Sequence, residues 1–230
     1  MTPREPLSKD RVLATAIALA DAHGIESVTM RRLAEELDVE AMSLYHHLPN
    51  KEAVLNGVVD LVFAEIVAGL PDLAATPSNW KAAVRQRALA ARAVLLRHPW
   101  APALIESRPA SGMPMTQYMD GIIGMLRAGG LSFDVIHHGM HALGSRAMGF
   151  VQEIGEGEGS NIPSLEQLAA MEPVVPNIVA MLRVVVHDGR DLTLGWCDDQ
   201  TEFEFGLDLI LDGLERAADR ERVHSPGGIR

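Results

Sequence analysis

The sequence predicts an all-α protein of about ten helices. Apolar residues recur at helical spacing along most of the chain, and capping residues stand where these patterns begin. No convincing run of alternating apolar and polar residues indicates a strand. With 47% apolar and 22% charged residues, a chain of 230 residues has enough apolar surface to bury a sizeable core.

The first helix is expected to begin at Ser8, a favourable N-cap residue, and to end at Gly24. Its buried stripe follows the 3.6-residue period and comprises Val12, Ala16, Leu19 and Ala20. Thr29 caps a second helix, whose inward residues are Leu33, Ala34 and Leu37. These patterns predict two helices within the first 37 residues.

A tight turn at Asp38 and Val39 leads to a third short helix over residues 41–48, which Pro49 ends. Asp38 suits such a turn because Asp tolerates the left-handed backbone conformation better than most residues. Two short helices joined in this way are typical of a helix-turn-helix, which lays its second helix in a DNA major groove. An ordinary solvated helical hairpin is the alternative.

The remaining helices follow from the same periodicity. A connecting helix covers 50–69, residues 71–78 form a linker, and further helices are expected at 78–98, 100–107, 114–128, 132–154, 165–185 and 200–220. Residues 155–161 and 188–199 are expected to be irregular. The chain is thus divided into a DNA-binding domain at 1–51, a ligand-binding and dimerisation domain at 70–220, and a flexible tail at 221–230.

The candidate DNA contacts lie on the exposed side of the helix-turn-helix. They are Thr29, Met30, Arg31, Ala41, Met42, Ser43, Tyr45, His46, His47 and Lys51. Arg31 can donate to guanine O6 and N7, and Met42 can contact a thymine methyl. Tyr45, His47 and Lys51 suit phosphate oxygens, with the amino end of the 50–69 helix assisting at Lys51.

Charge and composition exclude several function classes. The net charge of −11 argues against sequence-blind nucleic-acid binding, which needs clustered Lys and Arg. No phosphate-binding glycine loop, nucleophile motif or paired carboxylates indicate an enzyme. The apolar stretches are too short to span a membrane, and neither a secretory signal nor more than one Cys is present, so we expect a cytoplasmic protein.

Residues 44–55, Leu-Tyr-His-His-Leu-Pro-Asn-Lys-Glu-Ala-Val-Leu, follow Ile-Glu-Ser-Val-Thr-Met-Arg-Arg-Leu-Ala at 25–34. Together these segments resemble the amino-terminal domain of TetR-type transcriptional repressors. Residues 126–153, 203–215 and the Arg108-Pro109 pair resemble the carboxy-terminal domain of the tetracycline repressor class. The resemblance implies a homodimer whose core holds a small ligand and whose two heads bind a palindromic operator in double-stranded DNA. We expect recognition helices about 34–36 Å apart.

The residues support a homodimer independently. The 200–220 helix carries Phe205 and Leu209 outside its main apolar stripe, and a surface helix needs only one such stripe. The 132–154 helix has apolar residues at helical spacing along its whole length, and its glycines allow another helix to approach closely. Two such helices from each chain would form a four-helix interface. A purely internal core is the alternative.

The resemblance also indicates where a ligand pocket would lie. The candidate pocket residues are Val67, Gln86, Ala90, Leu104, Ser107, Ile122, Met140, Ser145, Met148 and Glu153. Leu104 stands where the resemblance implies a metal-binding His, and a lone carboxylate at Glu153 makes a poor divalent-cation site. We therefore expect no magnesium–tetracycline binding and no cofactor. A largely apolar pocket is predicted, a collapsed core being the alternative.

His137 and His141 are four residues apart, a spacing that can bind zinc. No third ligand is evident, so buried or interface histidines are the preferred interpretation.

The predicted function is a ligand-responsive transcriptional regulator, a repressor that a small, largely apolar effector releases from its operator. The alternatives are a small-molecule sequestering protein with a non-functional helix-turn-helix and, with less support, a helical enzyme. The sequence identifies neither effector nor operator, nor whether ligand releases or promotes DNA binding.

Overall fold

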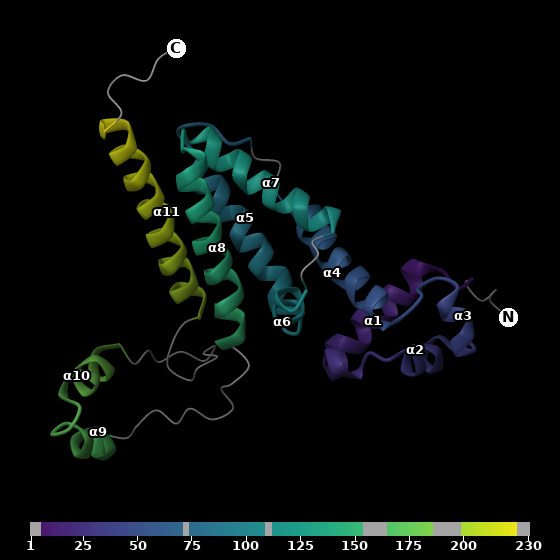
Figure 1. The fold of residues 1–230 in the computed structure, drawn as a ribbon. Coiled ribbons are helices and arrows are strands. Elements are labelled where there is room, and N and C mark those ends of the chain that lie inside the picture. The colour runs from purple at the N-terminus through teal and green to yellow at the C-terminus, as the bar shows by residue number, and fades with distance from the viewer. Residues whose placement is uncertain (1–5, 71–73, 109–111, 154–164, 186–198, 225–230) are drawn as a thin grey trace, which may run out of the picture.

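The computed structural model describes residues 6–70, 74–108, 112–153, 165–185 and 199–224, excluding the side chains of 150–153, 165, 182, 184, 185, 199 and 224. Within these ranges the chain forms eleven α-helices and one short 3-10 helix, with no strand (Figure 1). The predicted all-α fold class is confirmed.

The first three helices form a compact unit that we call the head. They are α1 (Lys9–His23), α2 (Met30–Leu37) and α3 (Ala41–Tyr45), with the 3-10 helix η1 (Ile25–Ser27) between the first two. Both predicted caps are present, because the Arg11 N–H donates to Ser8 Oγ at 3.2 Å and the Arg32 N–H donates to Thr29 Oγ1 at 3.1 Å. The first helix ends at Gly24, which adopts φ +78°.

Helix α4 (Lys51–Ala68) joins the head to the rest of the chain. The Ala53 N–H donates to Asn50 Oδ1 at 2.8 Å, so Asn50 is its N-cap. α4 contacts α1 on the head side and α5, α6 and α7 on the other (Figure 1). Gly57 lets α1 approach closely, since a Cβ there would lie 2.7 Å from Leu13 Cδ2.

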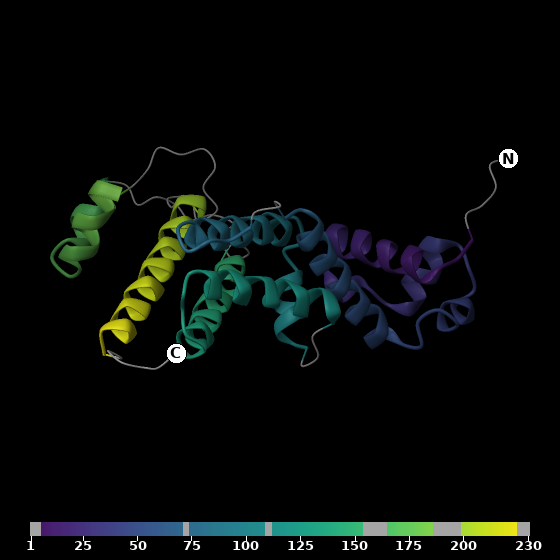
Figure 2. The same ribbon diagram turned by 90° about the horizontal axis from the view of Figure 1, so that it is seen from above.

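The larger domain contains α5 (Trp80–Arg97), α6 (Ala101–Glu106), α7 (Met113–Ala128), α8 (Phe133–Glu153) and α11 (Asp199–His224). α11 packs along α8, and ion pairs fasten it to α5 (Figures 1 and 2). Lys81 Nζ lies 2.7 Å from Glu215 Oε2, and Arg85 Nε lies 2.9 Å from Asp208 Oδ1. One continuous set of buried apolar side chains extends from the head into this domain.

Three predicted boundaries were wrong. Residues 165–185 form two helices, α9 (Leu165–Met171) and α10 (Pro176–Val185), because Pro173 and Pro176 lack the N–H that a continuous helix requires. α3 ends at Tyr45, not at 48, and residues 46 and 47 form a turn. α11 continues to His224, so residues 221–224 belong to a helix rather than to a tail.

Other predictions fall outside the described residues: the irregular segments at 155–161 and 188–198, and the tail from 225 to 230.

α9 and α10 pack on each other through Leu168, Val175 and Val179, which form a cluster separate from the main core. None of the helices in the described part of the chain is long and apolar enough to cross a membrane.

A cluster of polar side chains, which we call the joint, connects the head to the larger domain. His98, 7% exposed, lies between carboxylates of two helices: its Nδ1 is 2.7 Å from Asp21 Oδ1 of α1, and its Nε2 is 3.2 Å from Glu65 Oε2 of α4. The Trp100 Nε1–H also donates to Asp21 Oδ1, at 2.7 Å. The joint therefore fixes the orientation of α1 against α4.

Glu65 also accepts a hydrogen bond from the Arg97 guanidinium at 2.5 Å. Hydrogen bonds from Arg97 and His98 hold the pKa of Glu65 below its ordinary value of 4.5, although partial burial acts in the opposite direction. The stabilisation from this carboxylate is complete above pH 4.5 and is lost as the pH falls through the lowered pKa.

Replacing Asp38 tests the left-handed turn, where Asp38 has φ 52°. Asp38→Val should lower the free energy of unfolding by about 1–2 kcal/mol, because a β-branched residue is strained in this conformation. Asp38→Gly should change it by less than about 1 kcal/mol, since relief of strain offsets the greater chain entropy of glycine. Urea unfolding measures both values, and equal stability of the two variants would contradict the strain argument.

Replacing His98 tests the joint. His98→Ala leaves Asp21 and Glu65 without their shared partner, so the free energy of unfolding should fall by about 1–3 kcal/mol. His23→Ala is the matched control, because His23 is exposed at the end of α1 and should cost less than about 0.5 kcal/mol. Denaturant unfolding at pH 7 measures both, and a loss no larger than the control's would rule out the proposed role of His98.

Candidate nucleic-acid interface and core pocket

The turn between α2 and α3 has the geometry of a helix-turn-helix. Asp38 ends α2 with φ 52° and ψ 55°, and the Val39 N–H donates back to the Ala34 carbonyl at 3.0 Å. Leu33 and Leu44, both fully buried, lock the two helices together. The backbone conformation expected of Asp38 is present.

The outer side of α2 and α3 presents most of the candidate DNA contacts. Side-chain exposure reaches 88% for Arg31, and Met42 and Tyr45 are 71% and 42% exposed. Thr29, His46 and His47 are also exposed, whereas Met30, Ala41, Ser43 and Lys51 are half-buried. Met42 and Tyr45 are large apolar groups left in water on a short helix, as expected of a contact surface.

The cations of α2 pair along the helix surface. Arg31 Nε lies 3.1 Å from Glu35 Oε1, and Arg32 Nε lies 3.6 Å from Glu36 Oε1. Exposed pairs of this kind contribute little to stability, typically below about 1 kcal/mol. Arg31 can therefore leave its carboxylate partner at small cost.

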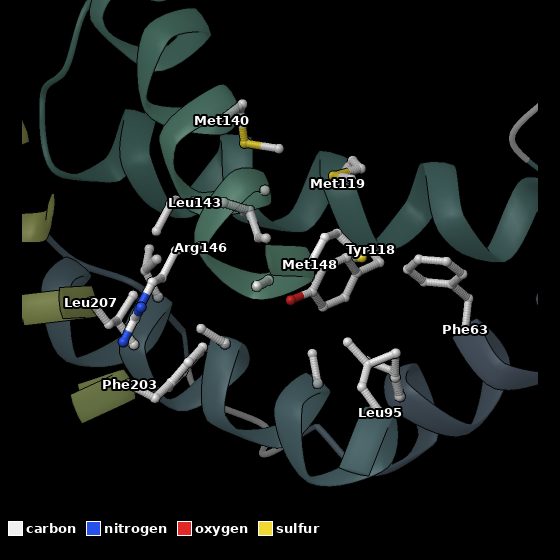
Figure 3. Close-up of a pocket in the computed structure, with 17 residues that line it drawn as sticks. Phe63, Leu95, Tyr118, Met119, Met140, Leu143, Arg146, Met148, Phe203 and Leu207 are labelled. Atoms are coloured by element: carbon white, nitrogen blue, oxygen red, sulfur yellow. The ribbon is translucent and has the colours of Figure 1, made fainter. Parts of the chain in front are cut away.

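A cavity lies in the larger domain between α4, α5, α7, α8 and α11, and we call it the inner cavity (Figure 3). The space between its lining side chains, counted together with the opening to solvent, is about 670 Å³. The lining is almost entirely apolar and includes Phe63 and Ile66 of α4, so one wall of the cavity belongs to the helix that carries the head.

The structure brings three of the candidate pocket residues, Ile122, Met140 and Met148, into this lining. Val67, Gln86, Ala90, Leu104 and Ser107 do not line it. Gln86 and Ala90 of α5 are absent from the lining because a different face of the helix points inward. That face carries Val84, Ala88, Ala91 and Leu95. Ser107 donates to the Leu104 carbonyl at 2.8 Å, and the Glu153 side chain lies outside the described part.

The candidate pocket residues do not include the aromatic and cationic groups of the cavity, chiefly Phe63, Tyr118, Arg146 and Phe203. Two guanidinium groups lie near the Phe203 ring, with Arg92 Cζ at 4.9 Å and Arg146 Cζ at 5.5 Å from its centroid. Only 4% of residues are aromatic, so aromatic residues within apolar stripes were a signal that could have identified these positions.

Tyr118 of α7 is 8% exposed, and its ring lies 5.8 Å from that of Phe63. Burial raises the pKa of Tyr118 to about 12, with Arg87 acting in the opposite direction. The phenol is therefore neutral at physiological pH.

A second, more open depression, the outer hollow, adjoins the inner cavity. Its lining comprises Glu106, Met119, Met140, His141, Gly144, Ser145 and Met148. Met119, Met140, Gly144 and Met148 line both spaces, so flexible methionine side chains separate them. The candidate pocket residue Ser145 thus lies in the outer hollow.

The three histidines of α8, His137, His138 and His141, are all exposed. The rings of His137 and His141 lie 4.9 Å apart. Within the described ranges, no group of three or more His, Cys, Asp or Glu side chains is placed to hold a metal ion.

A second polar contact holds α4 near its amino end. The Arg108 guanidinium, on the segment after α6, donates to Glu52 Oε2 at 2.9 Å and to Asn56 Oδ1 at 2.5 Å. Together with the joint, this contact attaches α4 to the larger domain at two points along its length.

Comparison with known proteins covers both parts of the chain. Residues 12–58 match the model described as bacterial regulatory proteins, tetR family, and residues 73–218 match the tetracyclin repressor-like C-terminal domain. The HTH-type transcriptional repressor DrrR1 of Streptomyces coeruleorubidus is 32% identical over 97% of this chain and 83% of its own length. Tetracycline repressor protein class C of Escherichia coli is 28% identical over 91% of each chain.

Solved structures agree with this result. ActR of Streptomyces coelicolor in complex with actinorhodin superposes with a TM-score of 0.74 at 25% identity, over 93% of this chain and 99% of that one. The superposition therefore extends over the head, the connecting helix and the larger domain of this chain. The chain belongs to the tetR family of bacterial regulatory proteins.

Proposed function

We propose that this chain is a ligand-responsive transcriptional repressor. Its affinity for operator DNA falls when a small, largely apolar effector enters the inner cavity. The observation that carries the proposal is the dual role of α4. Phe63 and Ile66 line the cavity, while the same helix packs against α1 of the head. An occupant of the cavity therefore contacts the element that orients the head.

The DNA-binding part of the proposal rests on the exposed face of α2 and α3. Arg31 is assigned to a base edge, Met42 to a thymine methyl, and Tyr45, His47 and Lys51 to phosphates. The chain is acidic as a whole, so specific contacts and a local cationic face must provide the affinity.

The ligand-binding part rests on the composition of the cavity. Its lining offers apolar side chains and no carboxylate within the described residues, which fits a lipophilic molecule and not a hydrated cation complex. The relative ActR has been solved with actinorhodin and with (S)-DNPA, which supports a small-molecule site in this domain.

The two attachments of α4 explain how occupancy could reach the head. Arg108 holds Glu52 and Asn56, and the joint holds Glu65 against α1. Because both are made of directional polar contacts, α4 has to break or re-form them when it moves. The effector must bind the two arrangements with different affinity to shift the equilibrium between them.

We assign dimerisation to α8 and α11, in agreement with the family's dimeric state. Phe205 and Leu209 of α11 are 62% and 53% exposed, although Phe203, Leu207 and Leu211 on the same helix are buried in the core. The second apolar face is thus available to a second copy of the chain, whose head would reach the other half of a palindromic operator.

Substitutions at the head test the DNA contacts on duplexes that the wild-type protein selects from random-sequence DNA. Arg31→Ala should weaken binding by about 1–3 kcal/mol and relax the preference at one base position, because a bidentate contact is lost. Lys51→Ala should weaken all sequences equally and lower the salt slope by about one. Gel-shift titrations at several salt concentrations measure both effects.

Arg222→Ala is the matched control, since it removes an exposed cation from α11, far along the chain from the head. It should leave operator binding unchanged. Failure of the wild-type protein to select any sequence would reject the regulator and favour the small-molecule sequestering alternative.

A charge in the second apolar face of α11 tests the dimer. Leu209→Glu should convert the dimer to monomer, because the interface would bury an unpaired carboxylate. Leu96→Glu makes the same change at a 39% exposed position of α5 and should leave the dimer intact. Sedimentation equilibrium distinguishes the two, and a dimeric Leu209→Glu protein would place the interface elsewhere.

A further inference from the structure

The polar groups in the lining of the inner cavity are both hydrogen-bond donors. Among the described residues that line it, only Tyr118 and Arg146 carry polar side-chain groups, and the others are aliphatic, thioether, aromatic or glycine. A guanidinium has no acceptor. The described residues therefore offer an occupant apolar contact and donors but no carboxylate that could neutralise a cation.

The Tyr118 hydroxyl forms no hydrogen bond with another group in the described part of the structure. Tyr118 is 8% exposed, and its interactions are ring contacts with Phe63 and Arg87 rather than hydrogen bonds. Figure 3 shows its oxygen pointing away from Phe63 into the cavity, toward the side where Leu143 and Arg146 lie. An occupant that accepts a hydrogen bond from this hydroxyl gains affinity.

A cation lies over the Tyr118 ring. The Arg87 Cζ is 5.0 Å from the ring centroid, and Gly121 makes room for the guanidinium, since a Cβ there would lie 2.4 Å from Arg87 Nη2. Positive charge over the π face withdraws electron density from the phenol, which strengthens its O–H as a donor and weakens its oxygen as an acceptor. Burial keeps the proton on, because it raises the pKa of Tyr118 to about 12.

We propose that Tyr118 is a specificity-determining residue of the effector site, and that the effector is an apolar molecule bearing a carbonyl oxygen that accepts a hydrogen bond from the Tyr118 hydroxyl. This inference rests on the proposed function, since it assigns the effector to the inner cavity. It names the chemical class of the effector: a carbonyl compound of largely hydrocarbon surface, neutral or anionic, and not an amine cation.

Benzophenone and diphenylmethane test the inference, because they share two phenyl rings and differ at the central carbonyl. Isothermal titration of the full-length protein should give wild-type binding about three- to ten-fold tighter for benzophenone, the range of a single net hydrogen bond. Tyr118→Phe should bind diphenylmethane as the wild type does and should lose the preference for benzophenone. Its thermal stability should equal or exceed that of the wild type, because no hydrogen bond is lost.

The outcomes separate this inference from the proposed function. If diphenylmethane binds and the carbonyl gives no advantage, or if Tyr118→Phe keeps the advantage, the role of Tyr118 is overturned while the apolar effector site stands. If Tyr118→Phe is markedly less stable than the wild type, the hydroxyl is structural, which overturns the inference. If neither probe binds, both the inference and the effector cavity fail, while operator binding is judged independently by gel shift.

Discussion

The position of α4 is the constraint on which the rest of the structure depends. Its residues serve two regions at once: Leu55 and Val58 are buried in the same core as the head, while Phe63 and Ile66 form a wall of the inner cavity. A continuous helix transmits displacement along its length, because its backbone hydrogen bonds make it stiff. The orientation of the head and the shape of the cavity are therefore properties of one element.

Polar contacts make this arrangement specific. Apolar burial holds α4 in place without fixing its direction, since hydrophobic contact is non-directional. Arg108 and His98 add contacts with defined geometry near its two ends. Such contacts permit discrete alternative arrangements of packed helices, which is what a two-state regulator requires. The chain has more Asp and Glu than Lys and Arg, and several of these carboxylates form ion pairs with cations on neighbouring helices.

The core of the larger domain combines an apolar cavity with charged residues at its edges. Arg92 is 5% exposed and packs over Phe203, and its Nη1 donates to Gln200 Oε1 at 2.8 Å. Arg146 lies near the same ring and donates to the Glu202 carbonyl at 2.5 Å. The amino-terminal part of α11 is thus held by guanidinium groups from α5 and α8, and this end of α11 closes one side of the cavity.

The sequence by itself determined the local structure. Caps at Ser8, Thr29 and Asn50, the left-handed Asp38 and the helical periodicity depend on neighbouring residues, so the all-α class and most helix boundaries were predictable. The predicted helix at 165–185 was wrong because Pro173 and Pro176 interrupt it. The exposed face of the helix-turn-helix was also predictable, because short-range spacing sets which residues face outward.

Only the tertiary structure decided the cavity and the joint. Which residues of α5 face inward depends on the rotation of the helix against α4 and α8, so Gln86 and Ala90 were expected in the pocket while Ala88 and Ala91 line it. Asp21, Glu65 and His98 are distant in sequence, and each looks like an ordinary surface residue alone. Contacts between helices arise from packing, and packing depends on the whole chain at once.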